Sequence, residues 1–204
     1  MASLPRPRLL PREAPSLQAR ARDDLRFIRS TMERAAAFTA VPGWGGVLIG
    51  LIAFLSVPAA ALAPSRDGWI LVWICSAFVA TLVGATDMAH KLRGGGASLL
   101  RGSGWRFVGA LIPPIVAGAC LTFVLARAGL HDLLPGVWLL CYGAGVVSAG
   151  TFSIRPVRAM GVCFMVLGLS ALLAPASWGD AWMAAGFGGL HVVFGLWIAR
   201  HHDG

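Results

Sequence analysis

Four ionisable side chains lie inside or at the edge of apolar segments of this sequence, where they could do chemistry: His191, Asp87, His90 and Arg155. Ionisable residues in such surroundings are rare, and they commonly form proton relays, ion sites or ligand contacts. His191 stands in the run GFGGLHVVFGLWIARHH (residues 186–202), between glycines and large apolar residues. A neutral imidazole has one donor and one acceptor to satisfy. We therefore expect His191 to face a neighbouring helix rather than lipid.

Three roles are open for His191. The simplest is a hydrogen bond to a hydroxyl or carbonyl group of a neighbouring helix, because helical spacing sets the histidine in a row of small residues that allow close approach. This row contains Ala184, Gly188, His191, Gly195 and Ala199. The second role, a haem ligand, is disfavoured because no other histidine lies at the same depth, so we predict no cofactor. The third is a ligand cavity or proton path that His191 shares with Asp87.

Asp87 lies four residues before Lys91, near the end of its apolar segment. The carboxylate can be hydrated there, or paired with Lys91 or Arg155, since residues four apart are neighbours on a helix. The functional alternative is a carboxylate that accepts protons or binds a cation at the mouth of a cavity. His90 and Arg155 are expected on the same side of the bilayer as Asp87.

No residue pattern typical of catalysis occurs. The sequence lacks GxSxG, HExxH and the phosphate-binding loop, and its four cysteines fall in four different apolar segments without paired spacing. We therefore predict no catalytic residues and no metal site. Four further polar residues fall in turns between the segments and are interpreted as solvated: Asp67, His131, Asp132 and Asp180.

Apolar segments must position these side chains. The 204 residues are 57% apolar and only 13% charged, whereas soluble domains have about 25% charged residues. Six apolar segments run roughly over 43–63, 69–89, 107–127, 134–154, 157–174 and 181–199, near the length that a bilayer requires. Backbone groups in lipid must be satisfied within a segment. The predicted fold class is therefore all-α, an integral membrane bundle of six transmembrane helices within residues 41–204.

The distribution of lysine and arginine predicts the orientation. Fifteen of the seventeen fall in the N-terminal region, the 90–106 and 155–158 loops and the C-terminus, whereas Arg66 and Arg127 fall on the opposite side. Because basic residues gather in cytoplasmic loops, we predict that both termini are cytoplasmic and that the protein lies in the inner membrane.

The N-terminal region is predicted to have two parts. Residues 1–15 contain four prolines and three arginines and are expected to be disordered. Residues 16–40 have an apolar stripe opposite Arg20, Arg22, Arg26 and Arg29, which predicts an amphipathic helix on the anionic inner leaflet, with Trp44 as an interfacial anchor. Nucleic-acid binding is disfavoured because the helix is short and its acidic residues dilute the charge.

Small residues four positions apart predict which helices pack closely. The fourth segment has such pairs at Ala144, Gly145, Ser148 and Ala149, and the sixth at Ala184, Ala185, Gly188 and Gly189. We expect these two helices in the bundle interior or at an oligomer contact.

Three stretches carry a family resemblance: residues 25–46, residues 134–161 and the run around His191. They resemble recurring segments of a group of uncharacterised bacterial multi-pass inner-membrane proteins. The resemblance implies a compact six-helix protein of the bacterial inner membrane. It implies no activity, ligand or site residue.

Three functions fit these observations. The first is an accessory, sensory or partner-binding membrane subunit without an evident catalytic site. The second is a small transporter or channel with Asp87 and His191 near the pathway, and the third is a redox subunit that binds haem or quinone. The expected partners are the lipid bilayer and either a second copy of the chain or another membrane subunit.

Overall fold

The computed structural model describes residues 43–94 and 103–202, together with residues 24, 25, 27, 28, 38, 39 and 41. The chain divides into two compact units, Met1–Ala36 and Ala37–Gly204. In the first unit the four described residues, which fall within the predicted helix 16–40, are helical and exposed. Phe38 and Thr39, at the end of that predicted helix, are not helical. The predicted tail 1–15 and the four arginines of the predicted basic face lie outside the described residues.

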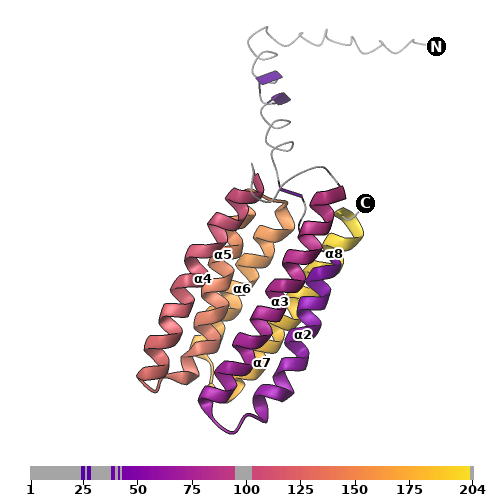
Figure 1. The fold of residues 1–204 in the computed structure, drawn as a ribbon. Coiled ribbons are helices and arrows are strands. Elements are labelled where there is room, and N and C mark those ends of the chain that lie inside the picture. The colour runs from indigo at the N-terminus through magenta and orange to yellow at the C-terminus, as the bar shows by residue number, and fades with distance from the viewer. Residues whose placement is uncertain are drawn as a thin grey trace, which may run out of the picture. The chain divides into compact units, whose positions relative to one another are not determined.

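The second unit is a bundle of helices (Figure 1). Its first five long helices are α2 (Trp44–Ala61), α3 (Arg66–Gly94), α4 (Ser103–Arg127), α5 (Leu134–Gly150) and α6 (Arg155–Leu173), with the short 3-10 helix η1 (His131–Leu133) before α5. The last span is composite: η2 (Ala176–Trp178), α7 (Gly179–Met183), the π-helix η3 (Ala184–Leu190) and α8 (His191–His202). Six helical stretches of the described residues are long and apolar enough to cross a membrane. The prediction of six apolar helices is confirmed.

The helix ends differ from the predicted boundaries where polar residues occur. Helix α3 continues through Lys91 to Gly94, beyond the predicted end at residue 89. Helix α5 ends at Gly150, four residues before the predicted end, because residues 151–153 form a turn whose amides bond back to the last carbonyls of the helix. Helix α4 ends at the predicted residue Arg127. There Gly129 adopts φ 72° and the amides of Gly129 and Leu130 bond to the carbonyls of Ala126 and Leu125, a Schellman motif.

Helix α5 lies between α4 and α6, and α2 lies between α3 and the last span. Helices α3 and α4 have the smallest fraction of buried residues, whereas α5 and the last span have the largest. These are the two segments predicted to lie in the bundle interior or at an oligomer contact. Large apolar side chains of α2, α3, α4 and α6 remain exposed along the bundle.

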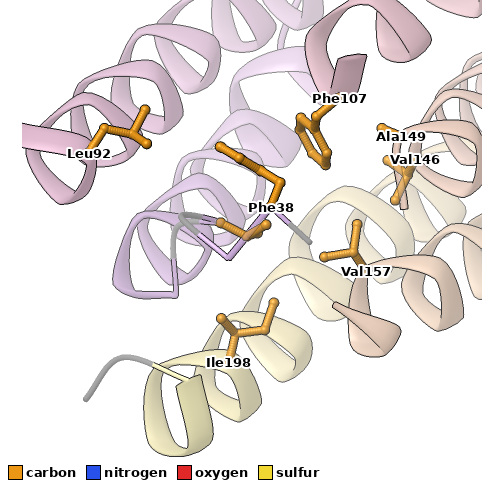
Figure 2. Packing of buried hydrophobic residues seen from close by; sticks show 8 residues of the cluster. Phe38, Leu92, Phe107, Val146, Ala149, Val157 and Ile198 are labelled. Carbon is orange, nitrogen blue, oxygen red and sulfur yellow. The ribbon is translucent and has the colours of Figure 1, made fainter. Parts of the chain in front are cut away.

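Two hydrophobic clusters fill the bundle. The first lies at the end where α8 finishes, here called the C-terminal end, and Figure 2 shows it around Phe38. Its buried members come from the residues before α2 and from five helices: Phe38, Val41, Leu92, Phe107, Val146, Ala149, Val157 and Ile198. The second cluster joins Ala53 and Ala60 of α2 with Trp73 of α3 and Met183 of α7. The bundle end that holds the α2–α3 and α4–α5 turns is here called the opposite end (Figure 1).

Glycines bring α5 and α6 into backbone contact. A Cβ atom built on Gly143 would lie 2.8 Å from the carbonyl oxygen of Gly161, and one built on Gly161 would lie 2.6 Å from the amide nitrogen of Val147. The pair Gly136 and Gly168 repeats this approach one heptad away. The sequence prediction missed these residues, although their seven-residue spacing is visible in the sequence.

The predicted packing residues have mixed outcomes. In α5, Gly145 and Ala149 are buried, Ala144 is half-buried and Ser148 is exposed. In the last span, Gly188 is buried and Ala184 half-buried, whereas Ala185 is exposed and the nearest atom to a Cβ built on Gly189 is 3.9 Å away. Ala185 and Gly189 therefore make no close helix contact within the chain. These residues lie in the π-helix η3, whose wider turns move residues four apart off a common face.

Candidate functional site

His191 is buried at the centre of the bundle, with only 5% of its surface exposed. Its Nδ1 lies 3.0 Å from the carbonyl oxygen of Phe187, and its Nε2 lies 2.8 Å from the hydroxyl of Tyr142 in α5. A carbonyl oxygen only accepts, so in the neutral imidazole Nδ1 donates and Nε2 accepts from the tyrosine. The expected interhelical hydrogen bond is present, and Tyr142 is its partner.

Aromatic rings enclose this histidine–tyrosine pair. The ring of Phe164, which is fully buried, contacts His191 edge-on with centroids 5.3 Å apart, and Phe187 stacks on the imidazole at 6.3 Å. Phe164 and Phe187 also contact Tyr142, at 4.8 and 5.2 Å. The imidazole therefore lies in a packed aromatic cluster between the last span, α5 and α6.

The predicted row of small residues around His191 is divided between two faces. Gly188 approaches Phe54 of α2, and Gly195 approaches the backbone of Val47 in the same helix. The imidazole instead contacts Tyr142 and Phe164 on α5 and α6. The prediction of one common face is therefore wrong. Gly188 lies in the π-helix η3, which ends immediately before His191 and departs from α-helical spacing.

Asp87 is half-buried on α3 and holds the start of α2. Its Oδ2 accepts a hydrogen bond from the amide of Gly45 at 3.0 Å. The amide of Gly45 is among the first N–H groups of a helix, which have no partner within the helix, and a carboxylate there is also stabilised by the helix dipole. One turn further along α3, Lys91 Nζ donates to the carbonyl oxygen of Val41 at 2.9 Å.

The contacts of Asp87 and Lys91 are part of a larger set of contacts that attach the residues before α2 to the C-terminal end of the bundle. The residues that lead into α2, here called the connecting segment, are described at positions 38, 39, 41 and 43. Phe38 donates its amide to the carbonyl of Phe152 at 2.7 Å and accepts from the hydroxyl of Ser153 at 2.7 Å. Its ring lies 5.1 Å from that of Phe107 and is almost fully buried (Figure 2). Phe38 is non-helical because its backbone bonds to the α5–α6 turn.

The four residues of the predicted intramembrane polar site do not form one site. His191 is buried with Tyr142, Asp87 bonds to Gly45, and His90 and Arg155 are exposed. No hydrogen bond or ion pair joins any two of the four. Within the described residues, no group of three or more His, Cys, Asp or Glu side chains is placed to hold a metal ion.

Arg155 instead lines a hollow at the C-terminal end, of about 370 Å³, together with Arg158. Both arginines belong to the first turn of α6 rather than to the preceding turn of the chain. Their exposed guanidinium groups make this end of the bundle basic.

A second hollow, of about 320 Å³, lies at the opposite end and was missed by the sequence interpretation. The tryptophan hollow, as it is called here, is lined by Arg66, Trp69, His131, Asp132, Pro135, Ala176, Ser177, Gly179 and Asp180. Arg66 and Asp132 form an ion pair at 3.2 Å, His131 and Asp67 lie 3.8 Å apart, and Trp69 Nε1 donates to Asp180 Oδ1 at 2.8 Å. Asp67 and Asp132 are exposed, as interpreted from the sequence, whereas His131 and Asp180 are half-buried and have polar partners.

No family model, curated protein or solved structure matches this chain. The resemblance to uncharacterised bacterial membrane proteins therefore remains a prediction from the sequence.

Proposed function

We propose that this chain is a multi-pass protein of the bacterial inner membrane and acts as an accessory, sensory or partner-binding subunit, with both termini in the cytoplasm. Six apolar helices and the large apolar side chains that they expose support insertion into a bilayer. The concentration of fifteen of the seventeen basic residues on one side supports the orientation. In this arrangement the C-terminal end of the bundle faces the cytoplasm.

The attachment of the connecting segment is the observation that carries this proposal. Phe38, Val41 and Gly45 are held by side chains or backbone groups of α3, α4 and the α5–α6 turn. Phe38, Val41 and Gly45, which follow the basic N-terminal region in the sequence, are thus buried against the bundle. Such an attachment suits a region that contacts anionic lipid or a cytoplasmic partner and must stay fixed to its anchor.

The two alternative functions receive less support. A transporter pathway through Asp87 and His191 would need both groups beside an accessible cavity, but Asp87 bonds to Gly45, His191 is packed among aromatic rings, and neither lines the two hollows described above. For a haem ligand, His191 would have to give up one of two hydrogen bonds, since both ring nitrogens are engaged. No cofactor is therefore proposed.

Native purification tests the proposed function. We expect full-length protein, gently solubilised from its own membranes, to retain a partner chain in fixed stoichiometry. Replacing Arg20, Arg22, Arg26 and Arg29 with glutamine should release that chain, because those arginines form the basic face of the predicted helix. The matched control replaces Arg6, Arg8 and Arg12, in the predicted disordered tail, and should retain it. Quantitative mass spectrometry of the three preparations gives the result.

Two outcomes would contradict the proposal. The first is the absence of any stoichiometric partner, second copies included, from the wild-type preparation. The second is a solute flux in proteoliposomes that is abolished by Asp87→Asn, because this would favour the transporter alternative.

A further inference from the structure

We propose that the tryptophan hollow binds a small alkylammonium group. This inference goes beyond the role proposed for the N-terminal region and does not depend on it. The volume of about 320 Å³ lies at the lower end of the roughly 300–1,000 Å³ typical of ligand pockets. A hollow of this size accommodates an amine with a few carbon atoms.

The charges around the hollow favour a cation. Arg66 is neutralised by Asp132, with Nη2 3.2 Å from Oδ1. Asp180 accepts its hydrogen bond from the indole N–H of Trp69, a neutral donor, so its negative charge is not cancelled by that contact. Besides His131, the ionisable residues of the lining are one arginine and two aspartates. An anion in the hollow would therefore meet the carboxylate of Asp180, which no cation among the described residues neutralises.

The apolar part of the lining suits the alkyl groups of such a cation. Trp69, Pro135 and Ala176 present aromatic and aliphatic carbon to the hollow. An ammonium ion beside a carboxylate and an indole gains both an ionic contact and, over the ring, a cation–π contact. This combination distinguishes an alkylammonium ion from a metal ion, which needs several oxygen or nitrogen ligands and no apolar wall.

The lining is held in place before any ligand arrives. The Trp69–Asp180 hydrogen bond joins α3 to α7 across 111 residues of sequence. Trp69 also stacks on Trp138 of α5, with centroids 5.4 Å apart and planes within 16°. A preformed lining reduces the ordering cost of binding.

Calorimetric titration of tetramethylammonium chloride into the full-length protein tests this proposal. The protein is held in a maltoside detergent, which carries no ammonium group, and tert-butanol serves as a neutral probe of the same shape. We expect tetramethylammonium to bind and tert-butanol not to bind. Asp180→Asn should weaken binding roughly tenfold, because it removes the charge while keeping an oxygen acceptor for Trp69. The control Asp67→Asn, outside the lining, should change the affinity by no more than about twofold.

A second variant allows the proposal to be tested even if Asp180→Asn misfolds. Ser177→Trp places a large side chain at an exposed position of the lining and should abolish binding by filling the hollow. Equal heats for the two probes, or an affinity that neither Asp180→Asn nor Ser177→Trp lowers, would overturn the proposal. Such a failure would leave the native purification result unaffected, so the two proposals can fail separately.

Nanodiscs distinguish the two sources of the ammonium group. One preparation contains phosphatidylethanolamine and phosphatidylglycerol, and the other contains phosphatidylglycerol alone, which has no ammonium group. If the lipid head group occupies the hollow, tetramethylammonium should bind more weakly in the first preparation. Equal affinity in both identifies a free amine as the ligand.

Discussion

Replacing Gly161 with alanine is expected to destabilise the bundle by about 2–3 kcal/mol, the upper part of the range for overpacking a filled interior. A Cβ atom at this position lies 2.6 Å from the amide nitrogen of Val147 and 2.9 Å from the carbonyl oxygen of Gly143. These are backbone atoms, which cannot rotate away as a side chain can. Helices α5 and α6 would therefore have to separate along their shared glycine contact.

Gly109→Ala is the matched control for this change. Gly109 is also helical, but a Cβ atom built on it meets nothing within 4 Å, so alanine should leave stability unchanged or raise it by up to about 1 kcal/mol. Thermal unfolding in detergent, followed by circular dichroism, measures both variants. Similar melting temperatures for the two alanine variants would show that the α5–α6 contact is looser than described.

The second large effect is expected at the His191–Tyr142 pair. His191→Leu leaves the tyrosine hydroxyl without its partner inside the bundle and should cost about 1–3 kcal/mol. His191→Gln keeps a donor and an acceptor and should fold nearly normally. Tyr142→Phe should be destabilising too, because it leaves Nε2 of the imidazole unpaired.

A double-mutant cycle separates the hydrogen bond from packing. The double variant His191→Leu/Tyr142→Phe lacks both polar groups. Its decrease in the free energy of unfolding should therefore be smaller than the sum of the decreases in the two single variants. Couplings of this kind in membrane proteins average about 0.6 kcal/mol and reach roughly 1.7 kcal/mol. Equal stability of His191→Leu and His191→Gln, measured by thermal unfolding in detergent, would refute the hydrogen-bond role.

The sequence predicts the spans well because their signal is compositional. A run of about twenty apolar residues has to be a helix if it crosses lipid, and this reasoning found the six long apolar helices of the described residues. It placed their ends less accurately. Lys91 continues α3 past the apolar run and bonds to Val41, a contact between residues 50 positions apart that no local pattern reveals.

The candidate sites were harder to predict because they depend on register. His191 was expected to hydrogen-bond a neighbouring helix, but the partner depends on η3, since a π-helical stretch changes which residues share a face. Tyr142 is the single tyrosine of the chain. Because it lies inside an apolar segment, it could have been proposed as the hydrogen-bond partner of His191. The tryptophan hollow could not have been predicted from the sequence, because its lining joins turns that are far apart in sequence.

Single-cysteine labelling of cells tests the central claim most directly, namely that the protein spans the membrane six times with its basic regions and both termini in the cytoplasm. The background lacks Cys75, Cys120, Cys141 and Cys163, and each variant has one new cysteine, from Asp67→Cys, Asp132→Cys or Gly95→Cys. We expect an impermeant maleimide added outside to label the first two variants, and to label the Gly95→Cys variant only after the membrane is permeabilised. Labelling of the Gly95→Cys variant in intact cells would contradict the proposed topology.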